Sequence, residues 1–219
     1  MHDGTETFDD LACGVDEAGR GPVIGPMVIA IVCGSNSAMK AAGARDSKIL
    51  SPSSRERLYS EIERIANEIS YRIITPDELN KRMENETLNE IEEDAYVSLI
   101  LHANTSTKVY VDSFDVLPER LEQKLSSMTN RVVVCRHRAD SIFPVVSAAS
   151  IIAKVVRDRE ILKLSEKYGD IGSGYPSDPR TIRFLTESLR NGTDISVIVR
   201  THWSTYRRIM AEVRSGRLF

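Results

Sequence analysis

The chain has 219 residues, of which 41% are hydrophobic and 28% are charged, and its formal net charge is −3 at pH 7. These values are typical of a globular protein with one sizeable core, and the net charge does not by itself indicate a nucleic-acid-binding protein. No apolar run reaches about 18 residues, and the polar, acidic N-terminus lacks the pattern of a secretory signal. We therefore expect a cytoplasmic protein without a membrane span.

Five apolar stretches, several of them rich in β-branched residues, predict strands. A short turn joins the first two, which favours an antiparallel hairpin. In chain order, the predicted strands cover residues 11–15, 27–33, 71–74, 108–111 and 131–135.

Apolar residues at helical spacing predict helices between and after these strands. The first opens at residues 51–53, and its apolar face is formed by Leu58, Ile62, Ile65 and Ile69. The next begins at residues 75–78, and the others cover 87–102, 117–125, 148–164, 179–189 and 205–213, with a loop over 172–179. This order predicts an α/β fold with a mixed five-stranded sheet flanked by helices. We expect one domain over residues 1–219, with a helical C-terminal extension from about residue 167.

The three cysteines, Cys13, Cys33 and Cys135, are scattered along apolar, strand-like stretches. There is no CxxC pair, and the four histidines are isolated, which argues against a zinc site. We expect the cysteines to be small buried hydrophobic residues in a reducing cytoplasm.

Four carboxylates lie at or just beyond the ends of predicted strands. Asp16 and Glu17 follow the first strand, Asp112 follows the fourth, and Asp140 follows the loop after the fifth. Strand ends can converge at one edge of a sheet, where α/β proteins commonly bind ligands. A cluster of carboxylates requires neutralisation, and an all-oxygen ligand set favours a hard cation such as Mg²⁺.

Each of these residues also has a purely structural interpretation. An Asp or Glu at a strand end is more often a turn former or a helix cap than a metal ligand. The residues taken singly leave this alternative open, because nothing local in the sequence proves that they converge.

Three further features have the same double interpretation. The turn Gly19-Arg20-Gly21 allows close approach of a ligand to the backbone, with an arginine able to grip phosphate, or it is a plain tight turn. Lys48 is either a phosphate contact or part of an exposed loop. Tyr175, in a Gly/Pro loop, either stacks on a sugar or base or serves packing.

Taken in order, these pieces resemble the signature of the type 2 ribonucleases H (ribonuclease HII), in the archaeal-like branch. The resemblance covers roughly residues 11–207. It rests on Gly14-Val15-Asp16-Glu17-Ala18-Gly19-Arg20-Gly21-Pro22, Asp46-Ser47-Lys48, Val111-Asp112, Ala139-Asp140, Val146-Ser147-Ala148-Ala149-Ser150-Ile151-Ile152-Ala153-Lys154-Val155, Arg157-Asp158 and Gly172-Ser173-Gly174-Tyr175-Pro176.

The resemblance implies a ribonuclease H-like fold and an endonuclease that cuts the RNA strand of RNA–DNA hybrids and on the 5′ side of ribonucleotides in duplex DNA. It implies two Mg²⁺ or Mn²⁺ ions on the four carboxylates, leaving 3′-hydroxyl and 5′-phosphate ends. The implied substrate contacts are Gly19, Arg20 and Gly21 around the 2′-hydroxyl, Tyr175 against the sugar at the RNA-to-DNA junction and Lys48 on a phosphate. Lys154 is an additional candidate, and Asp158 is expected to support the site or to form a surface ion pair.

The C-terminus departs from the family pattern. Many archaeal members end in a clamp-binding peptide with a Gln followed by spaced apolar and aromatic residues, whereas this chain ends Arg214-Ser215-Gly216-Arg217-Leu218-Phe219. Leu218 and Phe219 are either a reduced version of that peptide or a frayed terminus, so the sequence gives little support for a sliding-clamp partner. We expect a monomer.

Three rival functions are weighed against this one. A resolvase- or integrase-like nuclease of the same fold would cut all-DNA duplexes and would not need the glycine turn and the loop tyrosine. A non-catalytic nucleic-acid-binding module would not need four carboxylates. A magnesium-dependent phosphatase or kinase is ranked last, because no P-loop is present.

Overall fold

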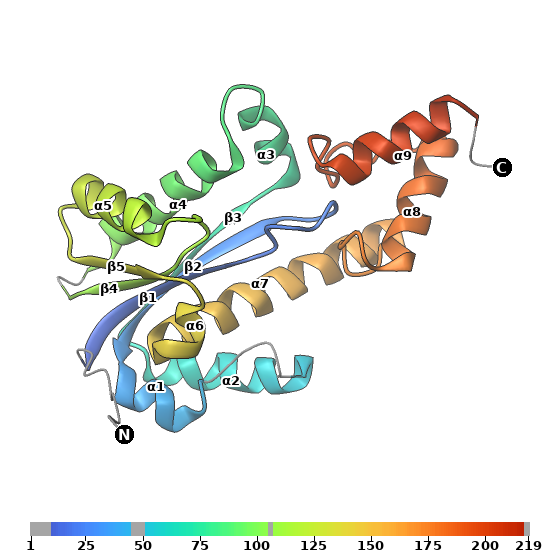
Figure 1. Ribbon diagram of the computed structural model, residues 1–219. Coiled ribbons are helices and arrows are strands. Elements are labelled where there is room, and N and C mark those ends of the chain that lie inside the picture. The colour runs from blue at the N-terminus through green and yellow to red at the C-terminus, as the bar shows by residue number, and fades with distance from the viewer. Residues whose placement is uncertain (1–9, 45–50, 105–106, 217–219) are drawn as a thin grey trace, which may run out of the picture. The chain divides into compact units, whose positions relative to one another are not determined.

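The computed structural model describes residues 10–44, 51–104 and 107–216. All five predicted strands are present as β1 (Leu11–Ala18), β2 (Met27–Ser35), β3 (Glu68–Ile74), β4 (Val109–Asp112) and β5 (Val133–Arg136). They form one sheet in the order β3-β2-β1-β4-β5 (Figure 1). The prediction of a five-stranded sheet flanked by helices is therefore confirmed.

Every helix predicted from the sequence is also present, with some changes of bounds. The helices are α1 (Asn36–Ala42), α2 (Pro52–Ile65), α3 (Pro76–Arg82), α4 (Leu88–His102), α5 (Pro118–Thr129), α6 (Ala139–Ile142), α7 (Pro144–Tyr168), α8 (Pro179–Arg190) and α9 (Ser204–Arg214). The extension of α2 to Ile69 is wrong, because Ile69 lies in β3. The helix expected from residue 148 begins earlier, at Pro144, since proline suits the first position of a helix. The short helices α1 and α6 were not predicted.

The chain divides into two compact units. The first comprises Met1–Asp16, Ala30–Tyr71 and Ala95–Ala153, and the second comprises Glu17–Ile29, Arg72–Asp94 and Lys154–Phe219. In the first unit, β1 pairs in parallel with β4, with Val15 opposite Val111. Strand β4 pairs in parallel with β5, and α5 packs on β5.

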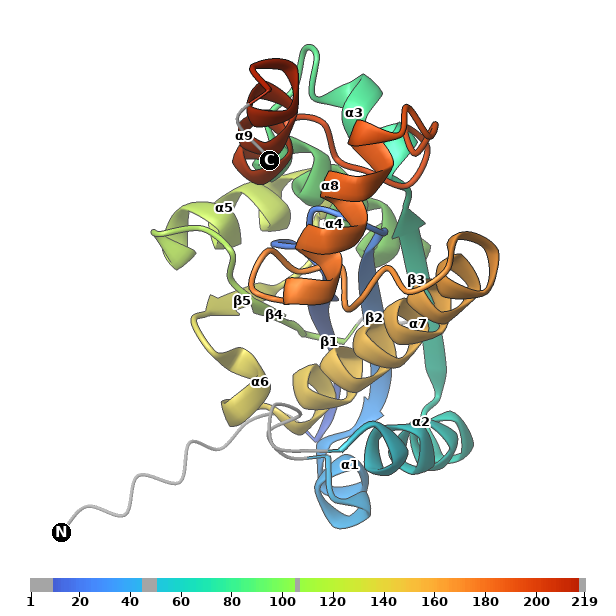
Figure 2. The ribbon, with the colours of Figure 1, turned by 90° about the vertical axis from the view of Figure 1, so that its right-hand side faces the viewer.

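The second unit has an apolar core of its own. Helices α8 and α9 lie side by side there (Figure 2). The buried core residues are Val23, Ile24, Ile161, Ile171, Leu185, Ile195, Ile198, Val199 and Ile209. None of the described helices has the length and the apolar character needed to cross a membrane.

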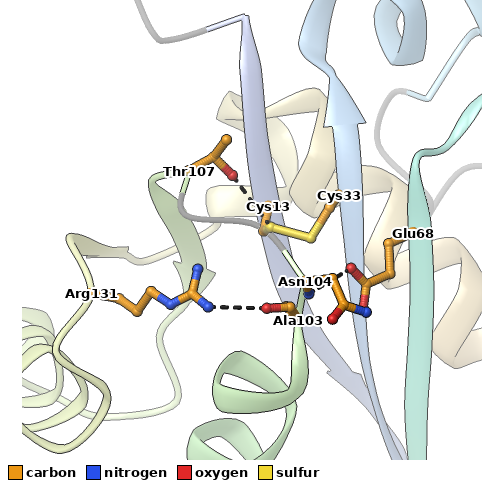
Figure 3. Close-up of a disulfide and its surroundings, with 7 residues drawn as sticks. All are labelled: Cys13, Cys33, Glu68, Ala103, Asn104, Thr107 and Arg131. Carbon is orange, nitrogen blue, oxygen red and sulfur yellow. Dashed lines mark hydrogen bonds between the residues drawn. A yellow bond between two sulfur atoms is a disulfide. The ribbon is translucent and has the colours of Figure 1, made fainter.

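Cys13 and Cys33 are buried, as expected, but they are not reduced thiols. A disulfide joins Cys13 on β1 to Cys33 on β2, with Cα atoms 4.0 Å apart (Figure 3). The two strands are neighbours in the sheet, and a separation of 20 residues along the chain does not reveal that the two side chains face each other. Cys135 is free and buried, as expected.

Candidate active site

Asp16, Asp112 and Asp140 converge in the first unit. Each offers a carboxylate oxygen, and these oxygens all lie within 4.8 Å of one another. Because Val15 is opposite Val111 in the parallel pair of β1 and β4, the next residues along the two strands, Asp16 and Asp112, are neighbours in the sheet. Asp112 is the last residue of β4, whereas β1 continues to Ala18, so Asp16 and Glu17 lie inside the strand and not, as the sequence had predicted, after it. Asp140 comes from the first turn of α6.

The cluster is withdrawn from solvent. Asp16 is 4% exposed and Asp140 is 3% exposed, and Asp112 is half-buried. Three carboxylates this close repel one another, and burial removes the water that would screen them. An all-oxygen donor set of this kind fits a hard divalent cation such as Mg²⁺ or Mn²⁺. Such an ion takes a few carboxylate ligands and fills its other positions with water or substrate phosphate oxygens.

A backbone hydrogen bond orients one of the carboxylates. The Ala139 N–H donates to Oδ1 of Asp112 over 2.9 Å. The preceding residue, Arg138, has a left-handed backbone with φ of 56°, a conformation that is uncommon for residues other than glycine. This conformation turns the chain into α6, so that Asp140 follows directly after the residue that holds Asp112.

Gly14 shows how closely β1 is packed next to this cluster. A Cβ atom at Gly14 would collide with the backbone of Val145 and Val146 at the start of α7. Only a residue without a side chain fits here. Gly14, which lies two residues before Asp16, therefore permits the start of α7 to lie against β1.

Glu17 is the first residue of the second unit and follows Asp16 on β1. The converging group contains Asp16, Asp112 and Asp140. Successive side chains of a strand point to opposite faces, so Glu17 and Asp16 leave β1 in different directions. The assignment of Glu17 to a metal site remains a prediction.

The glycine turn lies in the second unit. Gly19 has φ of +86°, and a Cβ atom there would lie 2.6 Å from the Arg157 side chain and 2.7 Å from the Pro26 carbonyl oxygen. The carbonyl of Arg20 accepts a hydrogen bond from Nη1 of Arg200 over 3.2 Å. The turn is thus a close-packed structure that only glycine can form at position 19.

Tyr175 lies beside this turn within the same unit. Its Cε1 atom lies 3.8 Å from the point that a Cβ atom at position 21 would occupy, and the residue is 38% exposed. The Gly174 carbonyl accepts backbone hydrogen bonds from Val23 over 2.8 Å and Ile24 over 3.2 Å. The two motifs that the family resemblance linked to ribose recognition are therefore brought together, with the edge of an aromatic ring beside a glycine turn.

Comparisons with known proteins agree with this geometry. The family model described as Ribonuclease HII matches residues 13–206. The chain belongs to the ribonuclease HII family.

Named relatives cover almost the whole chain. Ribonuclease HII of Thermoplasma volcanium is 50% identical over 95% of this chain and 97% of its own. The ribonuclease H2 structure from Pyrococcus horikoshii OT3 has a TM-score of 0.86 at 42% identity and covers 93% of this chain and 99% of its own. The ribonuclease HII in a complex with PCNA from Archaeoglobus fulgidus has a TM-score of 0.84 at 45% identity and covers 89% and 95%. As a family member, the chain is a metal-binding ribonuclease H with a ribonuclease H-like fold.

Two buried arginines pack against the glycine turn and the Tyr175 loop, and the sequence had assigned neither of them a role in the site. Arg157 is 5% exposed, donates from Nη2 to the Ser173 carbonyl over 2.9 Å and places its guanidinium 4.9 Å from the Tyr175 ring centre. Arg200 is fully buried and donates from Nε to the Gly25 carbonyl over 2.9 Å. Burial lowers the pKa of both side chains. The available signal was weak: each arginine directly follows an apolar pair, Val155-Val156 for Arg157 and Ile198-Val199 for Arg200.

The structure describes some of the remaining residues that the family resemblance named, but not all of them. Lys48, with Asp46 and Ser47, lies outside the described residues. Asp158 is 47% exposed, and its carboxylate lies 4.0 Å from Nη1 of the buried Arg157. Both roles expected for it, support of the site and a surface ion pair, remain predictions. Lys154 lies on α7, and its role remains a prediction.

Proposed function

We propose that this ribonuclease H hydrolyses the RNA strand of RNA–DNA hybrids and cuts on the 5′ side of ribonucleotides embedded in duplex DNA, with two divalent cations. The convergence of Asp16, Asp112 and Asp140 within 4.8 Å carries this proposal. Glu17 is proposed as the fourth ligand residue. Bound Mg²⁺ or Mn²⁺ supplies Lewis-acid chemistry, which lowers the pKa of the attacking water and stabilises the leaving oxygen.

The protein's own residues position the reaction. Asp16, Asp112 and Asp140 provide the negative charge that holds the cations, and the Ala139 N–H fixes one orientation of Asp112. The water adds to the phosphorus and the bond from phosphorus to the 3′ oxygen breaks, so the products carry a 3′-hydroxyl and a 5′-phosphate. Positioning and charge stabilisation dominate phosphoryl transfer, so little covalent work is required of the protein.

Recognition of the ribose is assigned to the second unit. The 2′-hydroxyl distinguishes RNA from DNA at a single position, and the backbone of Gly19, Arg20 and Gly21 offers polar groups without reading the base. Tyr175 lies beside Gly21, where its exposed ring is available to stack on the sugar at the junction. Lys48 is proposed to contact a phosphate.

The partners follow from the substrate. Hybrids and ribonucleotide-containing duplexes are the proposed nucleic-acid partners, and we expect a cytoplasmic monomer. The Archaeoglobus fulgidus relative is named in a complex with PCNA. A comparable clamp contact remains a proposal here, and it would use Leu218 and Phe219, which lie outside the described residues.

The test is a cleavage assay with Mg²⁺ or Mn²⁺ on a DNA duplex that carries one ribonucleotide. An all-DNA duplex and the Asp112→Asn variant are the controls. We expect a metal-dependent cut 5′ of the ribonucleotide by the wild type alone. A 2′,3′-cyclic phosphate product would overturn the mechanism, since the 2′-hydroxyl would then be the nucleophile, and equal cutting of the all-DNA duplex would favour a resolvase-like enzyme.

A further inference from the structure

A buried carboxylate lies beneath the glycine turn of the second unit. Glu92, on α4, is 0% exposed and forms an ion pair with Nη1 of Arg20. Both carboxylate oxygens are inaccessible to solvent. The second terminal nitrogen of Arg20, Nη2, donates to Oδ1 of Asn89 over 2.6 Å. Asn89 and Glu92 are three residues apart on one helix and therefore share a face.

A fully buried carboxylate is retained only when an opposite charge and hydrogen bonds compensate for the water it has lost. Arg20 supplies that charge to Glu92, and its planar guanidinium matches the geometry of a carboxylate. The pair thus fixes the direction of the Arg20 side chain, which is 32% exposed.

The main chain of Arg20 is held as well. Nη1 of the buried Arg200 donates to the Arg20 carbonyl, while the side chain is held by Glu92 and Asn89. Arg20 is therefore anchored at two points inside the second unit. Its flanking residues, Gly19 and Gly21, offer no side chains of their own to fix the turn.

We propose that Glu92 is a positioning residue that sets the discrimination between ribose and deoxyribose. It acts through Arg20 by holding the turn's N–H groups where a 2′-hydroxyl can meet them, so that no rearrangement is needed on binding. A displacement of about 1 Å can cost about 100-fold in a preorganised site, and the turn has the close packing that such precision requires. This inference rests on the proposed role of the glycine turn.

The experiment compares binding of a fluorescent duplex carrying one ribonucleotide with binding of the matching all-DNA duplex. Ca²⁺ replaces Mg²⁺ to prevent cleavage, and the readout is the ratio of the two dissociation constants. Glu92→Gln keeps the shape of the side chain and removes its charge. Glu86→Gln is the matched control, because Glu86 is ion-paired with Arg82 in the same unit.

We expect Glu92→Gln to lower the discrimination ratio by about 10- to 100-fold while the affinity for all-DNA duplex stays within about twofold, and Glu86→Gln to retain the wild-type ratio. A loss of folded protein would weaken binding to both duplexes equally, so the ratio of the two dissociation constants would not change. Asn89→Ala keeps the ion pair and is expected to reduce the ratio by a smaller factor. This second variant keeps the inference testable if Glu92→Gln does not fold. An unchanged ratio in both Glu92→Gln and Asn89→Ala overturns the inference, whereas a wild type without any discrimination overturns the role of the turn itself.

Discussion

The Ala139 N–H donates a hydrogen bond to Asp112 Oδ1 over 2.9 Å, and Ala139 directly precedes Asp140. The end of β4 and the first turn of α6 are therefore tied together at the point where two of the three clustered carboxylates arise. A change at one of these residues is expected to affect the other, and the consequences can be measured.

Replacing Asp112 with Asn should separate activity from stability. Without a cation the three carboxylates repel one another. Neutralising one of them should therefore raise the free energy of unfolding of the metal-free protein by about 0.5–2 kcal/mol. Cleavage should fall by about 100-fold or more, because changes even to residues that only support metal ligands cost about 10- to 100-fold. Thermal unfolding with EDTA and with Mg²⁺ checks both parts. Mg²⁺ should stabilise the wild type, and an equal metal-induced shift in the variant would contradict the assignment of Asp112.

The Arg20–Glu92 pair predicts a non-additive effect on stability. Arg20→Gln leaves the buried carboxylate uncompensated and should destabilise the protein by about 3 kcal/mol. Adding Glu92→Gln removes the stranded charge and should recover most of that loss. Urea unfolding of the wild type, the two single variants and the double variant gives the interaction energy of the pair by a double-mutant cycle. For comparison, Arg82→Gln breaks more exposed ion pairs with Glu86 and Asp94, and the loss of each pair should cost less than about 1 kcal/mol. A double variant as unstable as the sum of the singles would count against the pairing.

Asp178 gives a prediction about pH. It caps α8 and accepts hydrogen bonds from the backbone N–H groups of Ser173 over 2.8 Å and Arg180 over 3.0 Å. These bonds lower the pKa of its carboxyl. A lowered folded-state pKa adds stability that is complete above the unfolded pKa of about 3.9 and is lost as the pH falls through the folded-state value.

The melting temperature of Asp178→Asn should therefore lie below that of the wild type near neutral pH, and the difference should shrink below about pH 4. Circular dichroism at a series of pH values measures it. A difference that stays constant down to the acid end would mean that the charge of Asp178 plays no part.

The disulfide predicts a dependence on reductant. Closing a ring across 20 residues restricts the unfolded chain, which corresponds to about 3 kcal/mol. We expect a reducing agent, or the paired change Cys13→Ser with Cys33→Ser, to lower the melting temperature by several degrees. Cys135→Ser is the control for reductant sensitivity, because burial raises the pKa of that thiol to about 12 and keeps it protonated. Identical melting curves with and without reductant would contradict a stabilising bond.

The sequence identified the sheet and the carboxylates because their signals are local. β-Branched runs predicted the strands, and the positions of Asp16 and Asp112 next to the predicted strand ends indicated that they could converge, which the family resemblance then implied. Helix α6, only four residues long, gave no periodic signal, and Ile69 continued the helical spacing of α2 although it belongs to β3.

The supporting residues could not be predicted in the same way. Glu92 lies in an acidic helix segment, where a charged side chain is usually exposed, and its partner Arg20 is 72 positions away along the chain. Cys13 and Cys33 likewise gave no sign of their bond. Such pairings depend on which segments the fold brings together, and a single sequence does not contain that information in any local pattern.

The register of β1 against β4, with Val15 opposite Val111, has a consequence for how this site can evolve. The separation of Asp16 and Asp112 is inherited from the repeat of a hydrogen-bonded sheet, which is about 4.8 Å between neighbouring strands. Point substitutions in either strand cannot adjust that backbone spacing by small steps. A one-residue insertion or deletion would instead send one carboxylate to the opposite face. Small shifts in the backbone positions of the ligands are thus open to α6, whereas at the two strand positions only the length of the side chain can vary gradually.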